Sequence, residues 1–121
     1  MIGGAAVTMT IPAQSRFVAL ARVTATSLGA EVGMDVDELD DLRMGVDELV
    51  ASLVTATSDT AQIELRYELG AERIVITGRL DRGGGARLDE LGRHIVSAVT
   101  DDFRLDDSEF RLEKRRGATT R

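Results

Sequence analysis

The stretch Val36-Asp-Glu-Leu-Asp-Asp-Leu-Arg-Met-Gly-Val-Asp-Glu-Leu-Val-Ala-Ser-Leu-Val-Thr-Ala-Thr57 predicts the helix around which the fold is built. Its apolar residues recur every three or four positions, as in a helix with one buried face. They are Leu39, Leu42, Val46, Leu49, Val50 and Leu53. Asp35 and Glu38 have the spacing of a capping box, which marks the start of the helix. The first turns of this helix contain four acidic residues, Asp35, Asp37, Asp40 and Asp41. Their position indicates that they compensate the helix dipole rather than bind a cation.

The other elements follow from alternation and from helical periodicity. We expect strands at 7–11, 62–69, 73–77, 103–105 and 109–113. The second and third of these form one hairpin, and the fourth and fifth form another. A first helix starts near Ser15 and ends near Gly29 or Gly33, and a third helix begins directly after Arg87. The expected inner faces are Phe17, Leu20, Ala21, Thr24 and Leu28 in the first helix, and Leu88, Leu91, Ile95 and Ala98 in the third. The predicted core comprises Leu42, Val46, Leu49, Leu53, Ile74, Ile76, Leu91 and Ile95.

The order strand, two helices, two strands, helix, two strands predicts the fold class. Hairpin strands with one apolar face imply a mostly antiparallel sheet, covered by helices on one face and wet on the other. We therefore expect an α+β two-layer sandwich, formed by a single domain over 1–121 with an ordered core at about 7–115 and flexible tails.

The composition excludes several classes of function. The chain has no Cys and a single His, His94, so it offers no thiolate site and no multi-His metal site. A net charge of -6 argues against direct nucleic-acid binding. The basic run at 111–116 and the final Arg121 are interpreted as an edge strand and a frayed terminus. Without a signal-peptide pattern or a membrane-spanning apolar run, we expect a cytoplasmic protein with no membrane contact.

Three motifs, in this order and spacing, resemble the anti-sigma-factor serine/threonine protein kinases of the GHKL (histidine-kinase-like ATPase) superfamily. They are Ala21-Arg-Val-Thr-Ala-Thr-Ser27, Asp41-Leu-Arg-Met-Gly-Val-Asp-Glu-Leu49, and the segment from Leu91 to Phe103. The resemblance covers about residues 8 to 114. It implies the fold of these ATPases and a cytoplasmic bacterial regulator of transcription.

The second motif contains the family's catalytic Glu at Glu48. In the family, this Glu polarises the attacking group, and an Asn four residues later holds magnesium at the ATP phosphates. Positions i and i+4 share one face of a helix, so both side chains reach the same point. Ser52 stands in the place of the Asn, and its hydroxyl is a shorter and poorer magnesium ligand. Without the resemblance, Glu48 is interpreted as a solvated carboxylate.

The glycine-rich loop at 81–85 matches the family's adenine-binding string Asp-x-Gly-x-Gly through Asp81, Gly83 and Gly85. Asp81 lies about one residue too far from the preceding strand, however, and only two residues separate Gly85 from the expected third helix. The family has a longer lid here, closed by a second glycine motif that cradles phosphates, of which Gly92 is the remnant. We therefore expect a vestigial ATP site, although the loop can equally be a plain connector. His94 is expected to be a partly exposed helix residue.

The leading hypothesis is a binding protein that sequesters an alternative sigma factor. Arg22 matches the family's Arg that contacts the sigma factor, although it can also be an ordinary surface residue. The resemblance further implies a homodimer and, as an additional partner, an anti-anti-sigma factor. We expect no catalytic activity and no bound cofactor. The alternative is an active serine/threonine kinase that uses ATP and magnesium with Glu48 and Asp81. A third reading is a nucleotide-binding domain without a sigma partner.

Overall fold

The computed structural model describes residues 4–58 and 60–117; of the tails expected before residue 7 and after residue 115, residues 1–3 and 118–121, including Arg121, lie outside this range. The described residues form five strands, three α-helices and one short 3-10 helix. In chain order they are β1 (Ala5–Pro12), η1 (Ser15–Phe17), α1 (Val18–Val32), α2 (Val36–Val54), β2 (Gln62–Leu69), β3 (Arg73–Leu80), α3 (Glu90–Val99), β4 (Asp102–Asp106) and β5 (Glu109–Arg115). The predicted order of elements is confirmed.

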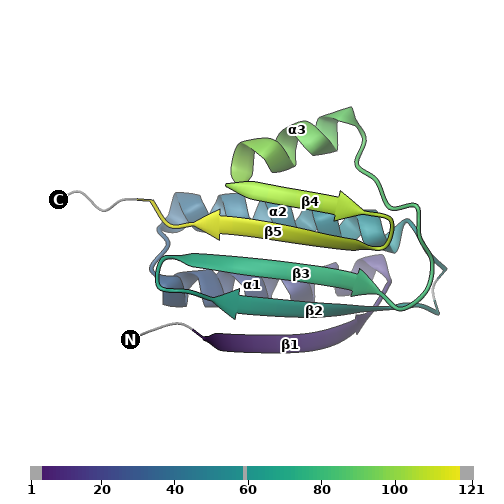
Figure 1. Cartoon of the computed structure of the whole chain (residues 1–121), viewed down its shortest axis with the longest axis horizontal. Coiled ribbons are helices and arrows are strands. Elements are labelled where there is room, and N and C mark those ends of the chain that lie inside the picture. Colours follow the sequence, from purple (N-terminus) through teal and green to yellow (C-terminus); the bar gives the residue numbers. More distant parts are fainter. Residues whose placement is uncertain (1–3, 59, 118–121) are drawn as a thin grey trace.

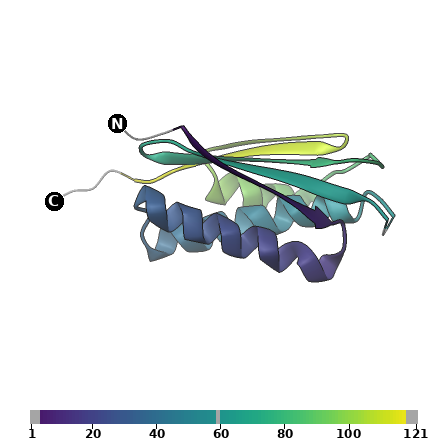
Figure 2. The same cartoon turned by 90° about the horizontal axis from the view of Figure 1, so that it is seen from below.

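The strands form one sheet in the order β1-β2-β3-β5-β4, and each of the four neighbouring pairs is antiparallel. All three helices lie on one face of this sheet, as Figures 1 and 2 show. The α+β class, the two hairpins and the single helix-covered face agree with the prediction. No helix within the described residues is long and apolar enough to cross a membrane.

Local sequence signals account for the ends of the helices. Asp35 accepts a hydrogen bond from the Glu38 N–H at 2.8 Å, and the Glu38 carboxylate accepts one from the Asp35 N–H at 2.9 Å. This is the predicted capping box, and it starts α2. Gly33 ends α1 with a φ of 99°, a left-handed conformation that glycine adopts without strain.

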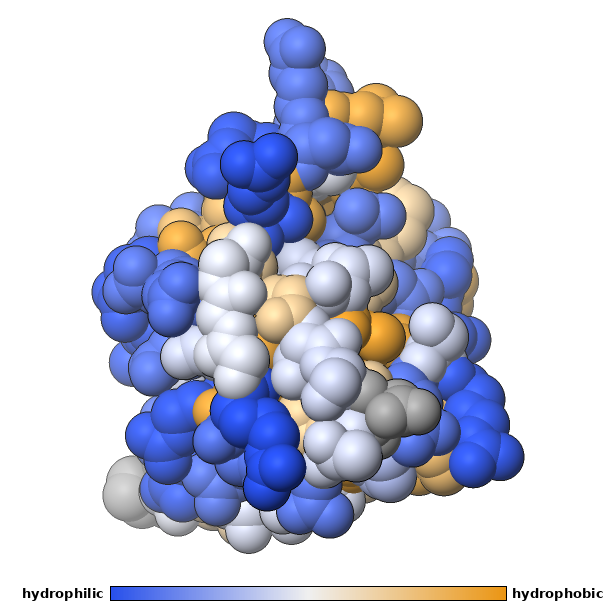
Figure 3. Space-filling model, turned by 90° about the vertical axis from the view of Figure 1, so that its right-hand side faces the viewer, coloured by the Kyte–Doolittle hydropathy of each residue, from blue (hydrophilic) through white to orange (hydrophobic). Residues whose placement is uncertain are grey.

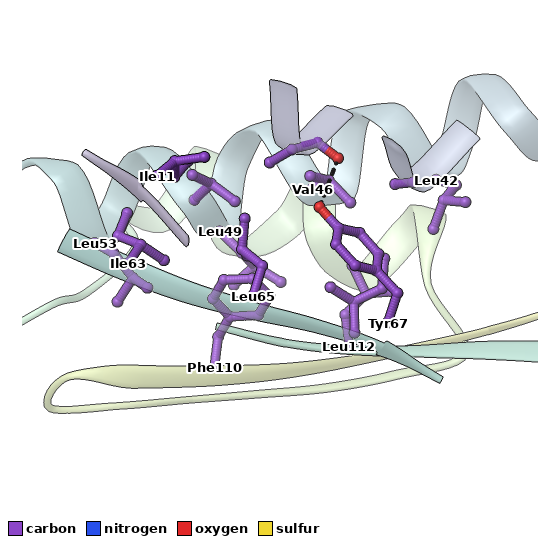
Figure 4. Close-up of a cluster of buried hydrophobic side chains, with 14 of the residues drawn as sticks. Ile11, Leu42, Val46, Leu49, Leu53, Ile63, Leu65, Tyr67, Phe110 and Leu112 are labelled. Carbon is purple, nitrogen blue, oxygen red and sulfur yellow. Dashed lines mark hydrogen bonds between the residues drawn. The ribbon is translucent and has the colours of Figure 1, made fainter. Parts of the chain in front are cut away.

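The core lies between the sheet and the helices (Figure 4). The apolar face of α2 and the alternate residues of β2 are almost completely buried, as predicted. Tyr67, also buried, donates a hydrogen bond from its hydroxyl to the Ala21 backbone oxygen at 3.0 Å. Burial raises the pKa of Tyr67 well above its ordinary value, because the charged phenolate would lose its hydration. β2 and α1 are therefore joined by a polar contact inside an aliphatic core.

The opposite face of the sheet carries ion pairs. The Glu113 carboxylate on β5 accepts hydrogen bonds from the side chain of Arg115 at 2.9 Å and from that of Arg73, on the neighbouring strand, at 3.0 Å. The hydrogen bond from Arg115, together with that from Arg73, lowers the pKa of Glu113. Arg79 similarly pairs with Glu64 across β3 and β2 at 3.1 Å. This face is wet, as expected.

Some details differ from the sequence-based expectations. Leu20 and Leu91, both expected in inner faces, are 48% and 68% exposed. In α3 the buried residues are instead Gly92, Val96 and Val99, and Ile95 is only half-buried. The helix begins at Glu90 rather than directly after Arg87, since Asp89 caps it.

Two strand assignments also need correction. β3 continues to Leu80, three residues beyond its expected end. The basic run at 111–116 does not belong to an edge strand, because β5 lies between β3 and β4. Lys114 of that run points toward the helices and pairs with Asp41 on α2 at 3.6 Å.

Candidate functional site

Glu48 lies on α2, half-buried against the first turn of α3. A Cβ atom on Gly92 would come within 3.0 Å of the Glu48 Oε1 atom, so the two helices are in direct contact here. The backbone N–H of Gly92 donates to the Asp89 carboxylate at 2.7 Å, which is the N-cap of α3. The positive end of α3 therefore favours the negative charge of Glu48, in addition to that of Asp89. The structure thus brings Glu48 and Gly92 together.

Ser52, one turn after Glu48, is only 6% exposed. Its hydroxyl donates a hydrogen bond of 2.6 Å to the Leu49 backbone oxygen in the same helix. This bond satisfies the buried hydroxyl within α2. Ser52 consequently acts as a small, internally bonded helix residue in this structure.

Asp81 lies on the other side of the sheet from Glu48. Leu80, the last residue of β3, points into the core, and alternation turns Asp81 to the outer face. There its carboxylate accepts a hydrogen bond from the Gln62 N–H at 2.8 Å, while the Asp81 N–H donates to the Gln62 oxygen at 3.0 Å. Asp81 thus closes the end of the β2–β3 ladder, and the structure does not bring it together with Glu48.

The glycine loop packs between the end of α2 and the turn between β4 and β5. Gly83 has a φ of 98°, and a Cβ atom there would come within 2.6 Å of the Thr57 hydroxyl oxygen. The next three backbone N–H groups all donate within the protein. Gly84 bonds the Ala56 oxygen at 3.3 Å, Gly85 the Asp107 carboxylate at 2.7 Å, and Ala86 the Asp107 backbone oxygen at 2.9 Å.

This end of the molecule is the right-hand side of Figure 1 and faces the viewer in Figure 3. Residues of intermediate hydropathy occupy the middle of that face, and strongly hydrophilic residues surround them. Hydrogen bonds hold the glycine loop against Asp107 and against Ala56 and Thr57, which follow α2. Asp107 follows β4 in a turn, and the sequence analysis had not singled it out.

Arg22 joins α1 to α2. Its Nε donates to the Asp47 Oδ1 atom at 2.9 Å, and the two side chains are 36% and 32% exposed. Arg22 is therefore not an isolated surface residue. The sequence contained both partners but no sign of their contact, because they lie 25 positions apart. His94 is exposed on α3, as expected.

Among residues 4–58 and 60–117, no group of three or more His, Cys, Asp and Glu side chains is arranged to hold a metal ion. No protein-family model matches the chain, and no curated protein sequence is similar to it.

Proposed function

We propose that this protein acts by binding another protein, an alternative sigma factor, and that its fold is a histidine-kinase-like ATPase fold with a shortened lid and a degenerate ATP site. One observation carries the proposal: the groups that would bind a nucleotide are already hydrogen-bonded within the protein. In the proposed frame, Glu48 keeps the place of the catalytic Glu, but its carboxylate rests against α3 at Gly92.

The backbone donors of the glycine loop support a degenerate site. Phosphates are bound by several backbone N–H groups that converge on one point. The N–H groups of Gly84, Gly85 and Ala86 donate to acceptors of the protein, and that of Gly92 donates to Asp89. Binding a phosphate here would require breaking these bonds, which weakens any nucleotide affinity.

The metal-binding position gives the same indication. A magnesium ion needs oxygen ligands in near-octahedral geometry at about 2.0–2.1 Å. The buried Ser52 hydroxyl lies in the place of the family's Asn and is bonded to Leu49. Phosphoryl transfer relies on metal and positioned charges for most of its acceleration, so the loss of this ligand disfavours the kinase alternative.

The helix layer offers the surface for the sigma factor. Arg22 uses one of its five N–H donors for Asp47, and its side chain remains 36% exposed, so a partner can reach the other donors. A partly exposed Arg held in place by an ion pair is preorganised for binding, which reduces the entropy lost on association. We therefore propose that the interface includes Arg22.

The proposal is tested by co-purification of the tagged protein with each sigma factor of its source organism, without added ATP. Capture of one alternative sigma factor supports the proposal. If the folded protein captures none of them, the proposal is wrong. If capture requires ATP, or if the protein phosphorylates an anti-anti-sigma factor, the kinase alternative replaces it.

Two matched variants test the role of Arg22. Arg22→Ala removes the side chain, whereas Asp47→Asn weakens the same ion pair and leaves Arg22 in place. We expect Arg22→Ala to weaken binding by about 1–3 kcal/mol, the scale of a moderate hot spot, and Asp47→Asn to have a much smaller effect. Equal losses in the two variants would mean that the ion pair only supports the helices.

A further inference from the structure

The face of the sheet that no helix covers carries its charges in rows. Alternation along each strand turns the side chains between the buried core residues toward this face, which lies at the top of Figure 2. The middle row crosses all five strands, because each of its residues lies directly opposite the next in the pairing register. In sheet order it contains Thr8, Arg66, Thr77, Arg111 and Arg104. We call it the arginine row, and its charged residues are all basic.

Acidic residues border the arginine row on both sides. They are Glu68, Glu113 and Asp102 on one side, and Glu64, Glu109 and Asp106 on the other. The second side also contains Arg79, which pairs with Glu64 at 3.1 Å. Successive rows are two residues apart along each strand, or about 6.7 Å. The uncovered face is therefore a positive stripe between two stripes that are mainly negative.

This arrangement in rows does not favour the stability of the sheet. Arg111 lies directly opposite Arg104, and Glu113 lies directly opposite Asp102. Like charges at such cross-strand positions are destabilising, whereas opposite charges there would stabilise the same strands. Local rules of stability are broken in this way mainly at functional sites. The rows therefore indicate a binding surface.

The arginines of the row have hydrogen-bond donors available for a partner. Arg66 donates its Nε to Glu68 at 2.9 Å. Arg111 has only long ion pairs, at 3.8 Å to Asp102 and at 3.6 Å to a second carboxylate, that of the next acidic residue on its own strand. Arg104 is exposed and has no hydrogen bond or ion pair within residues 4–58 and 60–117. Each guanidinium has five N–H donors, so most donors of the row have no acceptor in the described part of the chain.

We propose that the arginine row binds an acidic helix of a protein partner, laid across the strands. Neighbouring strands are about 4.8 Å apart, so Arg66 and Arg111, two strands apart, are separated by about 10 Å. Arg111 and Arg104 are one strand apart, or about 5 Å. In a helix, carboxylates at positions i, i+7 and i+11 share one face, with rises of about 10.5 Å and 6 Å between them. An extended segment matches less well, since its residues on one face recur about every 6.7 Å.

The acidic rows on either side determine which anions fit. A broad polyanion such as a nucleic-acid duplex would bring phosphates against these rows as well, and the protein has a net charge of -6. A helix with one acidic face and neutral or basic flanks meets the arginine row with its carboxylates and the acidic rows with its flanks. Charge complementarity therefore favours an acidic helix of a protein over nucleic acid.

The arginine row and Arg22 lie on opposite sides of the sheet. Arg22 is in the helix layer, whereas the row is on the face without helices (Figure 2). A partner at the row can therefore bind while the helix layer is occupied. The inference goes beyond the proposed sigma-factor function and does not depend on it.

NMR titration of the isotope-labelled protein with two synthetic helical peptides tests the proposal. Both peptides have the same Ala-rich composition with three Glu, placed at i, i+7 and i+11 in the first and on different faces of the helix in the second. We expect the first peptide to shift the amide signals of Arg66, Arg104 and Arg111 saturably at low salt. The second should bind at least ~3-fold more weakly. Equal binding of the two peptides, or no shifts in the row, would overturn the proposal.

Two charge-reversal variants locate the contact. Arg104→Glu reverses a charge in the row, whereas Arg87→Glu makes the same change at an exposed position before α3. We expect Arg104→Glu to weaken binding of the first peptide at least ~10-fold, and Arg87→Glu by less than ~2-fold. Equal losses would show that the peptide responds only to net charge, which contradicts the proposal.

Two further titrations test the other possible occupants of the row. An oligothymidylate that binds these residues more tightly than the first peptide would identify nucleic acid as the ligand. Shifts of the same amides with protein concentration alone would identify a second copy of the chain. Either result would overturn the proposal, and we expect neither.

Discussion

Gly78→Ala should destabilise the protein through one identifiable clash. Gly78 on β3 lies opposite Phe110 on β5. A Cβ atom at residue 78 would be 2.4 Å from the Phe110 Cε2 atom and 2.8 Å from its Cζ atom. Normal carbon contacts begin near 3.5 Å, so the ring has to move by about 1 Å. Phe110 is 1% exposed, and no solvent-filled space is open to it.

The expected cost follows from these distances. Overpacking of a core costs about 1–3 kcal/mol, and this contact falls at the upper end. Ala lowers the conformational entropy of the unfolded chain relative to Gly, and this offsets about 0.4–1 kcal/mol of the lost stability. The net loss is about 2 kcal/mol, which lowers the melting temperature of a chain of this length by about 8 °C. Urea denaturation followed by circular dichroism measures it.

A double-mutant cycle identifies the clash as the cause. Phe110→Leu alone leaves a cavity and costs about 1 kcal/mol, but combined with Gly78→Ala it makes room for the new methyl group. The double variant should be more stable than the sum of the single effects by at least ~1 kcal/mol. Gly45→Ala is a graded comparison: its nearest contacts, at 3.1 Å, require a shift of only about 0.4 Å, and Ala is favoured over Gly in a helix, so its cost should be much smaller. A neutral Gly78→Ala would refute the register of β3 and β5.

Three further changes have defined outcomes. Tyr67→Phe removes the bond to Ala21 and should cost about 1 kcal/mol at neutral pH, measured by urea denaturation. Burial raises the pKa of Tyr67 above its unfolded value of 10.0, so the protonated hydroxyl contributes fully to the free energy of unfolding below pH 10. This contribution is lost as the pH rises from 10 toward the folded pKa, and the free energy of unfolding therefore falls with pH. Tyr67→Phe should make this fall less steep, by up to ~1.4 kcal/mol per pH unit. Asp47→Asn should lower stability by less than ~1 kcal/mol, because its ion pair with Arg22 is about one-third exposed; a larger loss would mean that the pair is a main link between the helices. Asp107→Ala should speed amide exchange at Gly85 without creating nucleotide binding, and unchanged exchange would show that Asp107 does not hold the loop.

Local signals account for what the sequence predicts well. α2 combines a capping box at Asp35 with a regular apolar stripe, and both depend only on residues within the helix. The strict alternation of β2 likewise places Tyr67 in the core. These features need no knowledge of the neighbouring elements, so the element order and the α+β class follow from them.

The errors arise where tertiary packing decides. In α3 the apolar spacing favours Leu91 in the core, but it is Gly92 that faces α2, where a Cβ atom would come within 3.0 Å of the Glu48 carboxylate. For Asp81, three additional residues of β3 decide which face of the sheet its side chain occupies. The bonds of Arg22 and Gly85 join residues more than twenty positions apart, and a single sequence contains no pattern that reveals them.

Calorimetric titration of the purified protein with ATP and magnesium tests the central claim most directly. The claim is that the protein binds its partner without using a nucleotide, because the loop amides and Ser52 are bonded within the fold. We predict no magnesium-dependent binding heat, and capture of the sigma factor should be the same with and without ATP. Magnesium-dependent affinity in the low micromolar range, largely retained in Glu48→Ala, would contradict the account and indicate a working nucleotide site.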